Sequence, residues 1–509
     1  MSTTVLSSAS PKASTPERPV ASSRVLAGAR IGAVALGALL VFAAHFRPWE
    51  GGLLEEWALA RDWQLNGGWR VLYAYVEWTI SRPLHLIPTM LGLAISGGSP
   101  AGIFVIMGFV AVAQFAGVLW ALRTISRSFW LNIAIGLFIA LHPLWPAGLL
   151  QRFLPAQTAA LALIISLGLM VRWLQRGRAR WLIGTFVALI LGFAVYPGPA
   201  IVAPLAALAV ALAVPATWKR RVAVVATTTA TTGLTTLYSI VIVRLVTPAG
   251  QNSYELSNIE TSAVSGLRDL FRFVMGTFIN YGAPLLLGIL AVIVLGALLS
   301  LTGAIPNHAG WLMAGVAIVS PACAVVFFGS TAWLQDIDRV GYTTSLTLAV
   351  ALMIWPITAT GKQKRLEAVL LPAMALVAIA GCLVGIRQWQ PYVQTQRLLL
   401  TALAPVVEEA TDEESVVVVD RSGTFGYLYS FPLQYLQGAA YVADRDLSKV
   451  WLCFPDAGTF PLPSGGVVCD PTETGLNLRP AGSLAIGGGA VDFYIGKVDS
   501  SDFATKEFK

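Results

Sequence analysis

Long apolar runs separated by short polar stretches make up most of the chain. Runs of roughly 17–22 apolar residues recur, and a helix needs about 20 residues to cross the hydrocarbon core of a membrane. The pattern predicts membrane-spanning helices near residues 31–45, 101–122, 130–149, 156–173, 181–195, 200–214, 222–243, 284–301, 310–328, 343–355 and 366–386. We therefore expect an all-α polytopic membrane protein with about eleven transmembrane helices.

The apolar stretch 83–97 is predicted not to span the membrane. It is short, contains Pro83 and Pro88, and closes in the sequence SGGSP, which favours a re-entrant or interfacial helix. If this stretch does not cross, the basic clusters all lie on one side, as the positive-inside rule requires. These clusters contain Lys12, Arg18, Arg24, Arg123, Arg127, Arg172, Arg176, Arg178, Arg180, Lys219, Arg220, Arg221, Lys362, Lys364 and Arg365. The N-terminus is then cytoplasmic and the C-terminus extracytoplasmic.

The two ends of the chain are polar and flank a predicted transmembrane domain over residues 28–386. Residues 1–27 are rich in Ser, Thr, Ala and Pro, which predicts a disordered cytoplasmic tail. Residues 387–509 contain the β-branched run Val416–Val419 and several Gly- and Pro-containing stretches. Such segments are typical of strands joined by turns. We expect a small extracytoplasmic α/β domain here.

Cys453 and Cys469 are the two cysteines of this C-terminal segment. In an oxidising extracytoplasmic compartment they are expected to form a disulfide. Two unpaired, buried thiols are the alternative. Cys323 and Cys382 lie within apolar spans, where packing explains them.

Composition narrows the class of protein further. Only 12% of residues are charged and the mean hydropathy is +0.69, whereas about 25% of residues are charged in soluble domains. The net charge of +7 comes largely from short clusters between spans, so it indicates orientation and not nucleic-acid binding. The chain has no nucleotide-binding loop and no His/Cys cluster with metal spacing. An ATP-driven pump is therefore disfavoured.

The loop after the first span, residues 46–99, contains the adjacent carboxylates Glu55 and Glu56. Neighbouring helical residues point about 100° apart, so one carboxylate can reach a reactant while the other binds a metal or orients the loop. Nearby tryptophans would partly desolvate the carboxylates, which raises their proton affinity and suits a general base. The plain alternative is that both glutamates stabilise the positive end of a helix dipole.

Several charged side chains share the predicted extracytoplasmic face with these glutamates. In the run Ser81–His85, Arg82 can pair with a phosphate and His85 can donate a hydrogen bond to one. Arg339, just before a span, can hold an anionic head group, with Asp336 or Asp338 orienting it. Weaker phosphate candidates are Arg152, Arg268 and Arg272. The alternatives are an interfacial arginine that snorkels to water and a solvated loop with a local ion pair.

The order of these motifs resembles that of the GT-C superfamily of membrane glycosyltransferases, which use polyprenyl-phosphate sugars. Glu55-Glu56-Trp57-Ala58 follows the first span, and Arg82-Pro83-Leu84 comes some 25 residues later. Members of that family have paired acids in a large external loop, followed by two juxtamembrane helices. Leu86–Gly97 matches the second of those helices. The family commonly has Asp at the acid pair, so a divalent cation, Mg²⁺ or Mn²⁺, at Glu55 and Glu56 is left open here.

The resemblance implies an inverting sugar transfer on the extracytoplasmic face. Glu55 or Glu56 would deprotonate an acceptor hydroxyl, and Arg339, Arg82 or His85 would neutralise the departing lipid phosphate. The implied partners are a polyprenyl-phosphate-linked sugar and an envelope glycan or lipid acceptor.

Two other functions stay open at this point. A lipid-linked glycan transporter or flippase is disfavoured because the predicted spans contain few ionisable residues. A non-catalytic envelope assembly protein would instead present the segment 387–509 to a partner.

Overall fold

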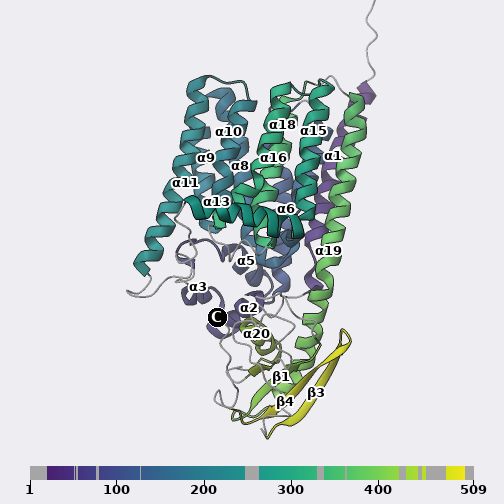
Figure 1. Ribbon diagram of the computed structural model, residues 1–509. Helices are drawn as coiled ribbons and strands as arrows, with labels where there is room; N and C mark the ends of the chain where they lie inside the picture. Colours follow the sequence, from purple (N-terminus) through teal and green to yellow (C-terminus); the bar gives the residue numbers. More distant parts are fainter. Residues whose placement is uncertain are drawn as a thin grey trace, which may run out of the picture.

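The computed structural model describes residues 20–50, 52, 55–75, 79–126, 128–246, 263–328, 337–360, 364–422, 432–444, 450–453 and 477–498. A bundle of long helices stands above a smaller layer of short helices and a β-sheet (Figure 1). The bundle contains α1 (Val20–His45), α6 (Ala101–Leu122), α7 (Phe129–Ala140), α8 (Leu154–Arg176), α9 (Ala179–Val195), α10 (Pro199–Ala213), α11 (Trp218–Val246), α15 (Ala283–Leu301), α16 (Asn307–Phe328), α18 (Ile337–Thr358) and α19 (Lys364–Glu409).

Seven of the described helices are long and apolar enough to cross a membrane. They lie in α1, α6, α8, α11, α15, α18 and α19. Three further apolar helices, α7, α9 and α10, are shorter. The protein is therefore a helical membrane protein. The total of eleven spans stays a prediction.

The stretch predicted to be interfacial forms a short helix, α5 (Ile87–Ile95). Its nine residues extend about 14 Å, which is less than half the thickness of the hydrocarbon core. Turns over residues 79–86 precede it. The length of α5 agrees with the expectation that residues 83–97 do not cross.

The predicted span 130–149 is wrong in its second half, because α7 ends at Ala140. His142 has a left-handed backbone (φ 48°) and is followed by Pro143. A residue before proline is disfavoured in the α-helical conformation, which explains the break. The chain continues through two short 3-10 helices, η3 (Pro146–Leu149) and η4 (Gln151–Phe153).

Buried side chains bond the backbone carbonyls that this break leaves without helical partners. The Arg47 guanidinium donates to the Leu149 carbonyl at 2.5 Å, and the Gln157 side chain donates to the Gly148 carbonyl. Irregular backbone within a bundle is stable only where protein groups satisfy it in this way. The break thus brings η4, which contains Arg152, to the end of the bundle that faces the sheet.

Two predicted domain boundaries differ from the helices observed. Residues 20–27, predicted as part of a disordered tail, belong to α1, since no proline or glycine interrupts the sequence between Pro19 and Gly28. The predicted boundary at 386/387 falls inside α19, a helix of 46 residues that runs from the bundle to the sheet (Figure 1). Leu399, Leu403 and Val407 are buried and continue its apolar face past the change in composition.

The C-terminal segment forms the α/β structure expected of it. The sheet contains β1 (Ser415–Asp420), β2 (Val450–Cys453), β3 (Arg479–Ile486) and β4 (Gly489–Gly496) in the order β2-β1-β4-β3. Strand β1 pairs with β2 in parallel, and β4 is antiparallel to β1 and β3. Helix α20 (Pro432–Ala443) connects the sheet layer to the short helices above it. The extracytoplasmic location of this segment stays a prediction.

Cys453 is buried and disulfide-bonded. Its expected partner, Cys469, lies outside the described residues, so the pairing of these two cysteines stays a prediction. Cys323 and Cys382 are buried free thiols, in line with a packing role.

Candidate functional site

Helix α2 (Glu55–Asn66) positions the paired glutamates just outside the bundle. Both carboxylates lie in its first turn, where they favour the positive end of the helix dipole. The helix ends before Gly67, whose φ of 72° is readily adopted only by residues without a side chain. Two further short helices, η2 (Gly68–Arg70) and α3 (Val71–Ala74), follow it.

Glu55 forms an ion pair with Arg152 of η4. The distance from Arg152 Nη2 to Glu55 Oε1 is 3.3 Å, and the side chains are 7% and 36% exposed, respectively. The second carboxylate oxygen, Glu55 Oε2, has no hydrogen-bond partner. Glu55 thus has one oxygen held by a buried cation and a second, buried oxygen without a partner.

Glu56 has a different environment, since its side chain is only 3% exposed. Glu55 is thus the more exposed of the two residues, and the division of roles between them stays a prediction. In the part of the chain that the structure describes, no group of three His, Cys, Asp or Glu residues is arranged to hold a metal ion. A divalent cation at Glu55 and Glu56 stays a prediction.

A row of aromatic rings extends from Arg152 into the end of the bundle. Arg152 lies 5.5 Å from the Phe153 ring centre, and Phe153 contacts Trp145 at 5.0 Å between centres. Trp145 then contacts Tyr342 at 5.0 Å, and Tyr342 contacts Tyr196 at 5.6 Å. Four different segments, η4, the break after α7, α18 and the turn that follows α9, thus meet at one place.

Glycines allow the aromatic row to pack closely. A Cβ atom on Gly198 would lie 2.7 Å from both Tyr196 and Tyr342, and one on Gly341 would lie 2.9 Å from Trp145. The Tyr342 hydroxyl donates to the Ala156 carbonyl at 2.6 Å, which fixes the ring. Trp145 and Tyr342 are not among the residues predicted from the sequence. The sequence marks Trp145 in one way: it stands between two prolines, which interrupt an apolar run.

His85 lies at the far end of the row, stacked on Tyr196 at 6.2 Å. Its Nδ1 is 3.0 Å from the Val195 carbonyl oxygen, which can only accept, so Nδ1 carries the hydrogen. Burial, together with the charge of Arg82, lowers the pKa of His85 to about 3. The neutral ring then has Nε2 as an acceptor, which is unsuited to binding phosphate, contrary to the role expected from the sequence.

Arg82 faces His85 closely enough for its charge to act on that ring. Its Nε is buried and has no hydrogen-bond partner. A guanidinium with an unused N–H suits an anionic ligand. Of Arg82 and His85, the two phosphate candidates in the run Ser81–His85, Arg82 is therefore the better one.

Asp338 and Arg339 belong to the first turn of α18. Arg339 is three positions before Tyr342, which places its backbone about one helical turn from the aromatic row. Asp336 and the side chains of Asp338 and Arg339 lie outside what the structure describes. The proposed contact of Arg339 with a head group stays a prediction.

A second buried ion pair, absent from the candidates chosen from the sequence, lies beside α2. Arg47 Nε is 3.0 Å from Glu50 Oε2, with the side chains 5% and 11% exposed. Glu50 ends the 3-10 helix η1 (Pro48–Glu50), and the Trp49 carbonyl accepts a hydrogen bond from Arg397 of α19 at 3.0 Å. The i,i+3 spacing of Arg47 and Glu50 was the available signal.

Helix α20 covers the opposite side of α2 from the bundle. The rings of Trp57 and Tyr441 are 5.7 Å apart, and Arg61 forms an ion pair with Asp444 at 3.2 Å. A Cβ atom on Gly438 would lie 3.0 Å from the Trp57 ring. The C-terminal segment is therefore packed directly on the helix that contains Glu55.

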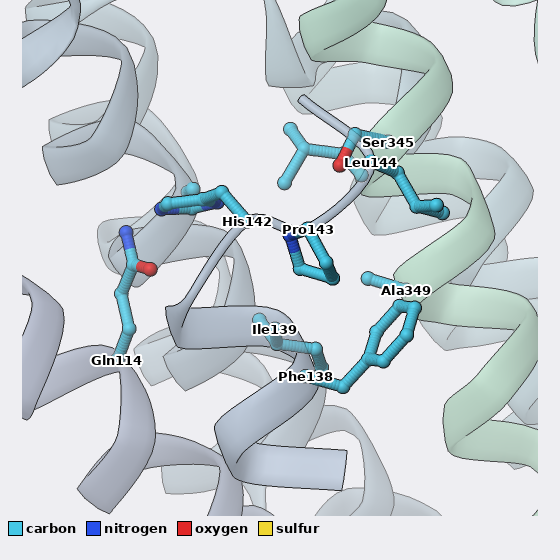
Figure 2. Close-up of a pocket in the computed structure, with 10 residues that line it drawn as sticks. Gln114, Phe138, Ile139, His142, Pro143, Leu144, Ser345 and Ala349 are labelled. Atoms are coloured by element: carbon cyan, nitrogen blue, oxygen red, sulfur yellow. The ribbon is translucent and has the colours of Figure 1, made fainter. Parts of the chain in front are cut away.

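A small cavity lies deeper in the bundle, between α6, the end of α7, α8 and α18 (Figure 2). Its volume is about 20 Å³, and Gln114, His142 and Ser345 are its polar lining residues. This volume suits about one water molecule, whereas sites for small organic ligands measure about 300–1,000 Å³. The cavity is thus too small for a sugar, and Glu55 does not line it.

No family model matches the chain, and no curated protein sequence matches it. A proposal about function therefore depends on the chemistry of the residues described above.

Proposed function

We propose that the protein is a membrane glycosyltransferase that moves a sugar from a polyprenyl-phosphate donor to a cell-envelope glycan or lipid acceptor. The observation that carries the proposal is the Glu55–Arg152 pair, in which Glu55 Oε2 is a buried oxygen without a hydrogen-bond partner. The pair is on a juxtamembrane helix, where a lipid-linked donor and a polar acceptor can meet. The proposal includes eleven spans, a cytoplasmic N-terminus and an extracytoplasmic C-terminal domain.

In the proposed reaction Glu55 is the general base. Its Oε2 takes the proton of an acceptor hydroxyl as that oxygen attacks the anomeric carbon of the donor. The bond from the anomeric carbon to the phosphate oxygen breaks, the configuration inverts, and polyprenyl phosphate leaves with the bonding electrons. Arg152 holds Oε1, so that the carboxylate keeps one orientation during the proton transfer.

The departing phosphate needs a fixed cation in a site of low water content. Arg82, with its unused Nε–H, is our first choice, and Arg339 at the start of α18 is the second. The rings of Trp145 and Tyr342, in the aromatic row that ends at His85, are buried. His85 contributes by positioning Tyr196 and is not assigned a charge.

The test is sugar transfer by purified, reconstituted protein, using a panel of radiolabelled polyprenyl-phosphate sugars and envelope acceptors. Glu55→Gln removes the base but keeps the shape, and we expect transfer to fall roughly 10²- to 10⁴-fold. Glu56→Gln is the matched control and should retain most activity. Equal activity of wild type and Glu55→Gln would reject Glu55 as the base. Failure of every donor in the panel would count against a glycosyltransferase and favour a transporter or an assembly protein.

A further inference from the structure

The segment between α11 and α15 contains a helix that lies across the bundle. Helix α13 (Ala263–Arg272) continues into a π-helical turn, η5 (Phe273–Phe278), and a last turn, α14 (Ile279–Tyr281). Figure 1 shows α13 running across the long helices, near the end of the bundle that faces the sheet. Its direction is that of an element lying along a membrane surface.

One side of this segment packs against the protein. Phe273 and Phe278 are each 2% exposed and belong to the main hydrophobic core, with their rings 5.7 Å apart. Asp269 is 5% exposed on the same segment. The segment is therefore anchored on the bundle and is not a loose connection.

The other side is apolar and exposed. Leu267 is 70% exposed, Phe271 67%, Met275 53% and Ile279 43%. Residues four apart lie above one another on a helix, so the first three form one stripe along α13 and η5. A soluble surface would not expose three large apolar side chains in a row without a partner.

Two arginines border the stripe. Arg268 follows Leu267 and is 59% exposed, and Arg272 follows Phe271 and is also exposed. Arg268 Nε is 3.7 Å from Asp269 Oδ1, which offsets part of its charge, while no such ion pair with Arg272 occurs among the described residues. An apolar stripe beside guanidinium groups is the arrangement found in helices that lie in a membrane interface.

The surfaces next to α13 indicate that lipid covers the exposed stripe. Helix α15, which is long and apolar enough to cross a membrane, exposes Val294 (64%), α16 exposes Ile318 (63%), and α13 contacts α16. Acyl chains cover such surfaces on a membrane-spanning helix, so a lipid layer is already adjacent to α13. A basic border to the stripe then favours anionic head groups over neutral ones.

We propose that the stripe Leu267–Phe271–Met275 inserts into the membrane interface and that Arg268 and Arg272 bind anionic lipid head groups. This surface fixes the depth at which the bundle sits. The inference does not depend on sugar transfer, and its test needs no enzyme assay.

Insertion is tested with spin labels on the full-length protein in lipid nanodiscs. Single variants Leu267→Cys, Phe271→Cys and Met275→Cys are labelled, with Leu290→Cys on α15 as the lipid reference and Lys497→Cys on the sheet as the water reference. The unmodified protein gives the background from its buried cysteines. We expect the three labels to collide with oxygen as the Leu290 label does. Collision with a water-soluble nickel chelate at the Lys497 level would overturn insertion. Protection from both reagents would mean that protein covers the stripe, and would also overturn it.

Charge selection is tested with spin-labelled lipids and the same nanodiscs. Wild-type protein should bind phosphatidylglycerol in preference to phosphatidylcholine. The variants Arg268→Gln and Arg272→Gln should each reduce that preference by roughly fivefold. The double variant Arg268→Lys/Arg272→Lys keeps the charge and should keep the preference. An unchanged preference in the double glutamine variant would overturn the head-group assignment.

Discussion

The two ends of the helical bundle use arginine differently. At the end away from the sheet, Arg172 donates to the carbonyls of Gly168 and Trp120, both at 2.7 Å, and Arg220 donates to those of Leu174 and Gln175, both at 3.1 Å. The carbonyls of Trp120, Leu174 and Gln175 lie in the last turn of α6 or α8, where the backbone lacks helical partners and the helix dipole is negative, while that of Gly168 lies further inside α8. The arginines there complete the helices.

At the end facing the sheet, arginines are also paired with carboxylates, although Arg47 bonds the Leu149 carbonyl as well. Arg47 pairs with Glu50, Arg61 with Asp444 and Arg152 with Glu55. Of these carboxylates, Glu55 combines partial exposure with an oxygen that has no partner. A cluster of arginines alone therefore does not indicate a reactive site. An arginine that holds one oxygen of a carboxylate whose other oxygen has no partner is a better indication. The predictions below test this contrast, beginning with the largest expected effect.

Replacing one arginine at each end should separate activity from stability. Arg152→Met frees the Glu55 carboxylate, and we expect sugar transfer to fall roughly a hundredfold because the base loses its orientation. Arg172→Met removes two bonds to carbonyls, and we expect a loss of about 1–3 kcal/mol in the free energy of unfolding with unchanged transfer. Denaturant unfolding in detergent and radiolabel transfer measure the two effects. A folded Arg172→Met protein without transfer would contradict the contrast.

The site end should also be the more sensitive to acid, because His85 is a half-buried, neutral ring there. Its pKa is about 3 in the folded protein and about 6.5 in the unfolded chain. As the pH falls below 6.5, the unfolded chain takes up a proton that the folded protein does not, so stability decreases. At pH 5 the loss is about 2 kcal/mol, and above pH 7 it is absent.

His85→Gln removes this group while keeping a donor for the Val195 carbonyl. The unfolding midpoint of the variant should therefore fall less between pH 7 and pH 5 than that of wild type. The same acid sensitivity in both proteins would show that another group is responsible.

The contact between α20 and α2 supports the site end from outside. Gly438→Val places a side chain against the Trp57 ring, and overpacking of this kind costs about 1–3 kcal/mol. We expect a lower thermal midpoint together with weaker sugar transfer, because α2 loses its cover. Gly233→Ala, where a Cβ atom would meet nothing within 4 Å, is the control and should be neutral or slightly stabilising. If a Gly438→Val protein with lowered stability kept full activity, the contact between α20 and α2 would matter for folding alone.

The smallest effect is expected at the exposed ion pairs of the sheet. Arg479 pairs with Glu409 and Glu414, and Lys497 pairs with Glu413, all near the surface. Exposed pairs contribute little and are screened by salt. Arg479→Ala should lower the thermal midpoint less than Gly438→Val does, and 1 M salt should remove the difference from wild type. A larger fall in the thermal midpoint would mean that the ion pairs of the sheet contribute more to the stability of the protein than expected.

The candidate site was only partly predictable from the residues. Glu55 and Glu56 were selected because two acids follow a span, and the structure gives them different environments, as a helix requires. Arg152 was a minor candidate, because nothing in a linear pattern indicates that a broken helix returns it to α2. His85 was expected to donate to phosphate, but its depth of burial and the Val195 carbonyl leave it a neutral acceptor.

By itself the sequence determined the series of long apolar helices, the short helix α5 and the strand that begins the C-terminal sheet. Apolar runs and β-branched runs are local signals, and the cost of exposing backbone or apolar surface makes them decisive. Only the tertiary structure decided the break after α7, the aromatic row, the Glu55–Arg152 pair and the cover of α2 by α20. Each of these depends on contacts between residues far apart in the chain, and no local pattern records which distant side chain will satisfy a buried polar group.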